Sequence, residues 1–176
     1  MMTASLTTST GIRLQPARRL SSPNRANRTI VRPLAALMPA DYGWVMASVA
    51  YTAAVSQWQS IQVMKARKEC GVPYPLMYAT GEGEAANKFN CTQRGHQNML
   101  ETLPLQLAMQ LLVGVLYPRG AAIQGAVWAT CRIAYMRGYM TGDPKKRNPG
   151  AAICFFSFVG LLLTTAVLGV RTALGM

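Results

Sequence analysis

Acidic residues are scarce in this sequence of 176 residues, and its charge is correspondingly one-sided. It has six Asp and Glu against 18 Lys and Arg, which gives a formal net charge of +12. A surplus of this size is often a sign of nucleic-acid binding. Six of the basic residues, however, lie in the first 40 positions, before the first acidic residue, Asp41. Because no RNA-binding aromatic motif accompanies them, we expect no nucleic-acid partner.

Histidine and cysteine are also few, and they lack the spacing of a metal site. The single histidine is His96, and four cysteines occur singly, Cys70, Cys91, Cys131 and Cys154. Without a histidine cluster or a paired cysteine motif, we expect no metal centre. We interpret the cysteines as thiols packed among helices rather than as a disulfide scaffold. The sequence contains no obvious Ser-His or Cys-His pair that would indicate a protein nucleophile.

Charge as a whole is low, and long apolar stretches take its place. Charged residues make up 14% of the chain and hydrophobic residues 51%, whereas soluble domains average about 25% and about 45–50%. A helix needs about 20 apolar residues to cross a bilayer. Tyr42–Met64 and Asn148–Val170 reach this length without a charge, and two further stretches, about 89–117 and 121–139, reach it only with polar residues at one end.

These four stretches predict an all-α fold, a membrane four-helix bundle with four transmembrane helices. The alternative is a soluble four-helix bundle. Its helices should each carry a wide polar stripe, and the stretch Asn148–Val170 has almost none.

Residues 1–36 have the composition of a targeting segment. They are rich in Ser, Thr and Arg, contain no acidic residue and lack the apolar core of a secretory signal. We predict an organellar transit peptide, with the opening residues favouring a plastid, followed by a membrane domain over residues 41–175. The alternative is a disordered basic leader that stays attached. We expect a plastid membrane if the leader is cleaved, and otherwise the endoplasmic reticulum.

The remaining basic residues gather on one predicted side of the membrane. With four spans, the first and third loops lie on the same side. That side then carries Lys65, Arg67, Lys68, Lys88, Arg94, Arg137, Lys145, Lys146 and Arg147. Beyond the leader, the other side has only Arg119 and Arg171. The positive-inside rule places the basic side in the cytosol, or in the stroma of a plastid.

Polar stripes follow the second and third spans near this basic side. The stripes are Arg94, Asn98 and Glu101 in the second span, and Arg132, Tyr135 and Tyr139 in the third. Spacings of three, four and seven residues put each set on one helical face. An ionisable group inside a membrane helix costs about 2.5–3.5 kcal/mol on insertion scales, so it is a candidate for function. The stripes end at mid-helix, which disfavours a channel or transporter.

The charges of these stripes indicate an anionic ligand. Arginine pairs bidentately with carboxylate or phosphate, and the lone carboxylate of Glu101 could receive an ammonium group. A small zwitterionic molecule with extra carboxylates fits this pattern. Simpler interpretations stay open: Arg94 and Arg137 as interfacial side chains that extend to the membrane surface, or a structural Glu101–Arg132 ion pair. Tyr135 and Tyr139 could likewise be interfacial aromatics, and the run Lys145-Lys146-Arg147 only a topology signal.

Several of these segments resemble a known family. They are Ala66-Arg67-Lys68, Phe89–Asn98, Glu101 with Pro104, Arg132–Tyr139 and Lys145-Lys146-Arg147. Together they resemble the MAPEG family, the membrane-associated proteins of eicosanoid and glutathione metabolism. Val72–Tyr78, Arg94–Asn98 and Gly138–Pro144 most resemble its microsomal glutathione S-transferases of the third type. The resemblance covers about residues 41–175.

The resemblance implies a homotrimer of four-helix protomers with glutathione as co-substrate, bound between neighbouring protomers. The positions that match glutathione contacts are Arg67, Arg94, Asn98, Glu101, Arg132, Tyr135 and Tyr139, and Arg147 matches the catalytic arginine that stabilises the glutathione thiolate. The match of Arg147 requires one extra residue after Tyr139. Two positions depart from some members, which have arginine at Lys68 and tyrosine at Thr102.

The implied activity is that of a glutathione transferase in lipid. A free thiol titrates near 8.5, and lowering its pKa to about 7 takes roughly 2 kcal/mol, which one well-placed arginine can supply. The thiolate would attack a lipophilic electrophile or reduce a lipid hydroperoxide, as in a glutathione peroxidase. The alternative is a non-catalytic lipid-binding scaffold of the same fold, similar to the lipoxygenase-activating protein. A scaffold need not keep Arg94, Tyr135 and Arg147 together, so we favour the enzyme.

Overall fold

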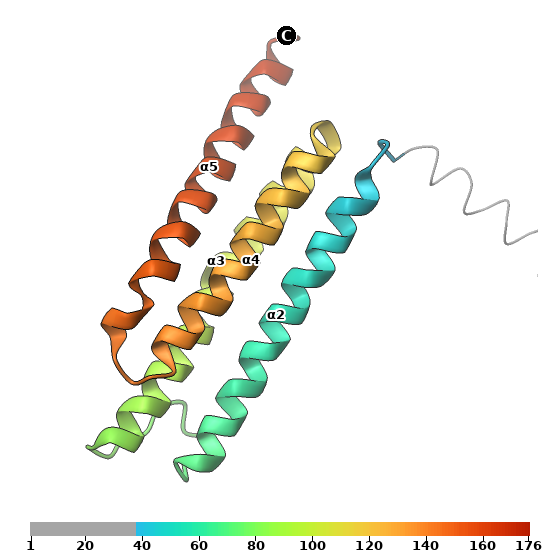
Figure 1. Ribbon diagram of the computed structural model, residues 1–176. Coiled ribbons are helices and arrows are strands. Elements are labelled where there is room, and N and C mark those ends of the chain that lie inside the picture. The colour runs from blue at the N-terminus through green and yellow to red at the C-terminus, as the bar shows by residue number, and fades with distance from the viewer. Residues whose placement is uncertain (1–37) are drawn as a thin grey trace, which may run out of the picture. The chain divides into compact units, whose positions relative to one another are not determined.

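Four long helices make up most of residues 38–176, the part of the chain that the computed structural model describes (Figure 1). The predicted leader lies outside these residues. The helices are α2 (Tyr42–Glu69), α3 (Glu84–Leu116), α4 (Pro118–Tyr139) and α5 (Asn148–Ala173), and a short 3-10 helix, η1 (Pro144–Arg147), runs directly into α5. The predicted all-α four-helix bundle is confirmed.

Proline and glycine set the helix boundaries. Gly83, with a φ of 128°, directly precedes α3, and glycine is the residue that adopts a positive φ without strain. Pro118 is the first residue of α4, a position where its missing N–H costs nothing. The side chain of Asp143 caps η1 by accepting a hydrogen bond of 2.9 Å from the Lys145 backbone N–H. α3 begins at Glu84, five residues before the predicted start at about residue 89. The helix is longer because it begins directly after Gly83.

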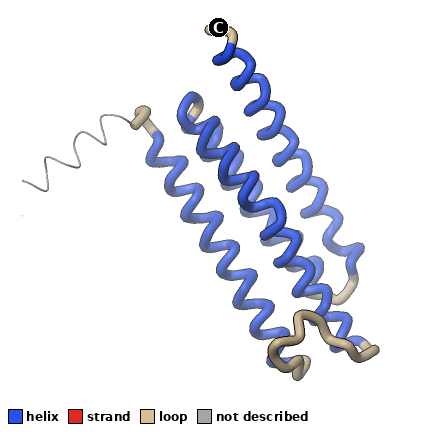
Figure 2. Tube along the Cα trace, turned by 180° about the vertical axis from the view of Figure 1, so that it is seen from behind, coloured by secondary structure: helices blue, strands red, loops and turns tan. Residues whose placement is uncertain are grey.

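The helices run alternately up and down (Figures 1 and 2). α2 and α5 lie on opposite sides of the α3–α4 pair, and α4 packs against all three other helices. Both longer loops, 70–83 and 140–147, lie at one end of the bundle, which we call the loop end. The start of α2, the short α3–α4 connection and the C-terminus lie at the other, where an ion pair of 2.9 Å joins Asp41 to Arg119.

Hydropathy distinguishes the helices. Among the described residues, α3 and the continuous segment Pro144–Ala173 are long and apolar enough to cross a membrane. α2 does not pass the same test, although the prediction counted its charge-free stretch among the clearest spans. α5 has the largest apolar surface facing outward. Only Gly150, Cys154 and Leu161 are buried along it, and its exposed side chains include Phe155 and Phe156.

The interior of the bundle contains polar side chains well beyond the predicted stripes. The buried amide of Gln110 donates to the Ser48 hydroxyl (3.0 Å), and Gln106 donates to Gln124 (2.9 Å), which in turn donates to Ser157 (3.1 Å). The interpretation that polar residues end at mid-helix was therefore wrong. These amides bond to side chains of neighbouring helices, as required where no water is available.

Two glycines let α4 approach the η1–α5 segment closely. A Cβ on Gly150 would lie 2.5 Å from the Tyr135 backbone nitrogen, and one on Gly138 would lie 2.4 Å from the Lys146 carbonyl oxygen. Both neighbours are backbone atoms that cannot rotate away. Small residues of this kind allow membrane helices to pack backbone against backbone. We call this contact the α4–α5 seam.

We predict that Gly150→Ala lowers the melting temperature of the purified protein, measured in detergent by differential scanning fluorimetry. Overpacking of a close contact costs about 1–3 kcal/mol. The matched control is Gly160→Ala in the same helix, where a Cβ would meet nothing within 4 Å. Alanine is the better helix former, so the control should keep or raise the melting temperature. Equal shifts in the two variants would contradict the role of the seam.

Candidate functional site

A cavity of about 500 Å³ opens at the loop end between α3, α4 and the η1–α5 segment. Its size is typical of small-molecule sites. Its lining is Arg94, Asn98, Thr102, Arg132, Tyr135, Arg147, Asn148, Ala151, Cys154, Phe155 and Phe158. The polar residues come mostly from α3 and α4, whereas α5 supplies a largely apolar wall. Five of the eight site residues predicted from the sequence line this cavity.

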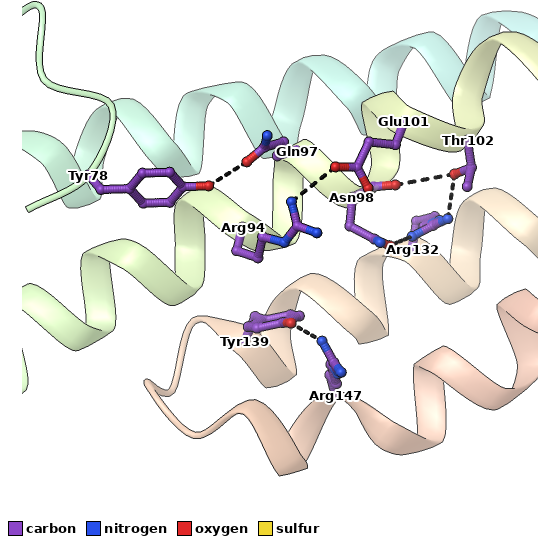
Figure 3. A network of polar contacts seen from close by, with 9 residues as sticks. All are labelled: Tyr78, Arg94, Gln97, Asn98, Glu101, Thr102, Arg132, Tyr139 and Arg147. Atoms are coloured by element: carbon purple, nitrogen blue, oxygen red, sulfur yellow. Dashed lines mark hydrogen bonds and ion pairs between the residues drawn. The ribbon is translucent and has the colours of Figure 1, made fainter.

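Arg132 is the most buried charge of the site. Only 4% of its surface is exposed, and its guanidinium donates to Asn98 Oδ1 at 2.8 Å and Thr102 Oγ1 at 2.6 Å (Figure 3). It also lies over the ring of Trp128, 4.8 Å from the centroid. The guanidinium Nε has no hydrogen-bond partner. The structural Glu101–Arg132 ion pair considered above is not formed, so a buried cation faces the cavity with neutral partners, which favours an anionic ligand.

Arg94 and Glu101 pair with each other instead. Their side chains form an ion pair of 3.0 Å, and each is 46% exposed (Figure 3). Exposed pairs of this kind contribute about 0–1 kcal/mol. Both side chains can therefore exchange this partner for a ligand at little cost.

Arg147 lies at the junction of η1 and α5, against the two tyrosines of α4. It donates a hydrogen bond to the Tyr139 hydroxyl (Figure 3), and its guanidinium lies 4.9 Å from the centroid of that ring and 5.9 Å from that of Tyr135. The tyrosine rings are 5.2 Å apart. Gly138 positions this arginine, because a Cβ there would lie 2.8 Å from the Arg147 Cα.

Arg67 is the one predicted site residue that the structure holds well away from the cavity. Its guanidinium donates to the Leu76 carbonyl oxygen at 2.6 Å and lies over the rings of Tyr74 and Phe89, 4.6 and 5.0 Å from their centroids. Arg67 therefore joins the last turn of α2 to the first loop. Lys145 and Lys146, next to Arg147 in the chain, are exposed.

The first turns of α3 hold both loops of the loop end in place. The Asn90 side chain bonds to the backbone N–H and C=O of Ala79, at 2.8 and 3.1 Å. Asn87 donates to the Gly142 carbonyl oxygen at 2.7 Å, and the Tyr78 hydroxyl donates to Gln97 (Figure 3). In the sequence, Asn90 was noted only as part of the segment Phe89–Asn98, which resembles the family. Asn90 lies four residues before Arg94, and this spacing was the signal that the two share one face of α3.

Sequence reasoning also missed what α5 and Thr102 contribute. Cys154, Phe155 and Phe158 line the cavity, although an uncharged span gives no sign of which face it turns inward. Thr102 was noted only as a departure from a tyrosine, whereas its hydroxyl is a partner of Arg132. The signal available was its spacing of four from Asn98, the other partner of Arg132.

The fold and the site together define a helical membrane protein with a cationic cavity at one end and an apolar wall beside it. The family model for the MAPEG family matches residues 45–167, more than half of the chain, and the match includes residues of all four helices. The protein belongs to the MAPEG family, which includes membrane glutathione transferases and peroxidases. It is accordingly an integral membrane protein.

We predict that Thr102→Val destabilises the protein by about 1.5–3 kcal/mol, because it removes a hydrogen bond to a buried charge. The melting temperature should fall. The matched control is Thr164→Val in α5, an exposed residue whose hydroxyl bonds only to the Gly160 carbonyl oxygen of its own helix, and it should change little. If Thr102→Val is as stable as the control, Thr102 does not support Arg132.

Proposed function

We propose that the protein is a membrane glutathione transferase, of the third microsomal type, that also reduces lipid hydroperoxides with glutathione. The observation that carries this proposal is the convergence of Arg94, Arg132 and Arg147 on one cavity in which α5 provides a largely apolar wall. Three cations in the lining, with the Glu101 carboxylate paired to one of them, suit a small peptide with several charges. The apolar wall suits a partner that arrives from the bilayer.

Glutathione matches the charges of the cavity. It has two carboxylates and one ammonium group. The carboxylates would pair with Arg94 and with Arg132, which has no acidic partner of its own within 4.0 Å among the described residues. The ammonium group would pair with Glu101, once its weak ion pair with Arg94 opens. Asn98 contributes an amide at the centre of this set.

Arg147 is the residue we propose to activate the thiol. Its hydrogen bond to Tyr139 and its contact with the Tyr135 ring leave it in the cavity wall, on the side of the apolar residues of α5. A cation in a partly dry site stabilises a thiolate, and about 2 kcal/mol lowers the pKa of the glutathione thiol from about 8.5 to about 7. The thiolate then attacks the electrophilic atom of the lipophilic substrate, or the terminal oxygen of a hydroperoxide.

The apolar substrate would approach along α5. Phe155 lines the cavity and is 62% exposed on the outside of the bundle, so it lies at the boundary between the cavity and the surrounding lipid. Phe158 and Ala151 extend this wall inward. An electrophile dissolved in the bilayer could reach the thiolate without passing through water.

Arg67 fits the proposal only through assembly. It lies outside the cavity of its own chain, and we propose that it contacts glutathione bound to a neighbouring protomer of a homotrimer. For residues 1–36 we retain the proposal of a cleaved transit peptide and a plastid membrane, with the endoplasmic reticulum as the location if the leader stays attached.

We predict that glutathione added to the purified protein at neutral pH produces an ultraviolet thiolate band, and that Arg147→Leu removes most of it. Returning the thiol pKa from about 7 to about 8.5 lowers the thiolate fraction at pH 7 by about 15-fold. Turnover with a lipophilic electrophile should fall with it, while calorimetry still detects bound glutathione. The matched control is Arg137→Leu, an exposed arginine of the last turn of α4, which should keep the band.

Two outcomes would count against this proposal. A full thiolate band and full turnover in Arg147→Leu would show that another group activates the thiol. The absence of both a band and glutathione binding in the unaltered protein would favour a lipid-binding scaffold of the same fold.

A further inference from the structure

Two of the four cysteines face each other across the α4–α5 seam. Cys131 of α4 and Cys154 of α5 are 8% and 4% exposed and belong to the same core cluster. Both are free thiols. The other two cysteines are held elsewhere: Cys70 donates to the Ala85 carbonyl oxygen and Cys91 to that of Gly142.

The register of the seam explains why this pair meets. Gly150 of α5 lies against the backbone of Tyr135 in α4, where the two helices approach closely. The helices are antiparallel. Four residues onward in α5 is Cys154, and four residues back in α4 is Cys131, so each lies one turn further along the same face of its helix. The seam thus brings the two thiols opposite each other.

Cys154 is also open to the cavity. It lines the wall that α5 provides, beside Phe155 and Phe158. This position exposes the Cys154 sulfur to a molecule bound in the cavity, and oxidation of a thiol requires such exposure.

We propose that Cys131 and Cys154 are a redox-active dithiol, which a lipid hydroperoxide in the cavity oxidises to a disulfide. The inference rests on the proposed function for the identity of the oxidant, which is the second substrate of that site. The dithiol inference goes beyond the proposed function because the electrons come from the protein's own thiols rather than from glutathione.

The chemistry balances in two steps. The Cys154 sulfur attacks the terminal peroxide oxygen, the O–O bond breaks, and the lipid leaves as an alcohol that takes up the thiol proton, so that Cys154 becomes a sulfenic acid. The Cys131 sulfur then attacks the Cys154 sulfur, the S–O bond breaks, and water leaves with the Cys131 proton. The dithiol is oxidised by two electrons and the hydroperoxide is reduced by two. Two molecules of glutathione reverse the change by thiol–disulfide exchange and leave as glutathione disulfide.

The test oxidises the purified full chain in detergent with cumene hydroperoxide, without glutathione. Intact mass should fall by two hydrogen atoms, denaturing alkylation should label two cysteines instead of four, and peptide mapping should join residue 131 to residue 154. Addition of glutathione should restore all four thiols. The double variant Cys70→Ala/Cys91→Ala should behave in the same way, because neither cysteine lies in the seam. Cys131→Ala should stop at a sulfenic acid on Cys154, trapped by dimedone.

Four alkylatable thiols after exposure to the hydroperoxide would overturn the proposal, and so would a bond that maps to Cys70 or Cys91. If Cys131→Ala does not fold, the unaltered chain and the Cys70→Ala/Cys91→Ala variant decide the question. The oxidation step contains no glutathione. A protein that fails to produce a thiolate band but forms the disulfide would contradict the transferase proposal alone, and the reverse result would contradict the dithiol alone.

Discussion

The close approach of α4 to the η1–α5 segment is the contact on which the site depends. Gly138 and Gly150 let backbone meet backbone there, and no residue with a Cβ would fit without a shift. Because the segment is held this near, Arg147 reaches the Tyr139 hydroxyl and α5 provides a wall of the cavity. A wider separation would move the proposed thiolate-stabilising arginine away from Arg132 and leave the apolar wall without a facing polar surface.

The bundle has two chemically different halves along its axis. Towards the loop end, arginines and a glutamate surround the cavity, and Arg132 has only neutral hydrogen-bond partners. Beyond it, the buried polar groups are uncharged, and Gln106 and Gln110 bond to side chains of neighbouring helices. The first half is arranged to receive a charged ligand, and the second half holds the helices together. Apolar side chains, among them Trp128 and Met99, fill the space between the polar groups.

Much of the fold was accessible from the sequence, because charge-free stretches and Pro/Gly breakers act locally. The starts of α2 and α5, at Tyr42 and Asn148, are where the apolar stretches begin. The polar stripes were visible because helical spacing determines a shared face. What could not be predicted depends on how helices rotate against one another: Arg132 bonds to Asn98 and Thr102 rather than to Glu101, and Arg67 turns to its own loop. The buried amides were not predicted because the stripes were traced from charged residues, although the spacing of four between Gln106 and Gln110 also puts these two on one helical face.

The amide pairs also bear on how the chain enters the membrane. Gln106 and Gln110 lie on α3, but their partners lie on α2 and α4. If α3 left the translocation machinery alone, it would carry two unpaired amides into hydrocarbon, at a cost of several kcal/mol for each unsatisfied polar group. Insertion of α3 is therefore favoured when α2 already lies beside it and α4 enters soon after. The connection of one residue between α3 and α4 allows this close succession. Biogenesis of this protein should proceed by helix pairs rather than by single helices.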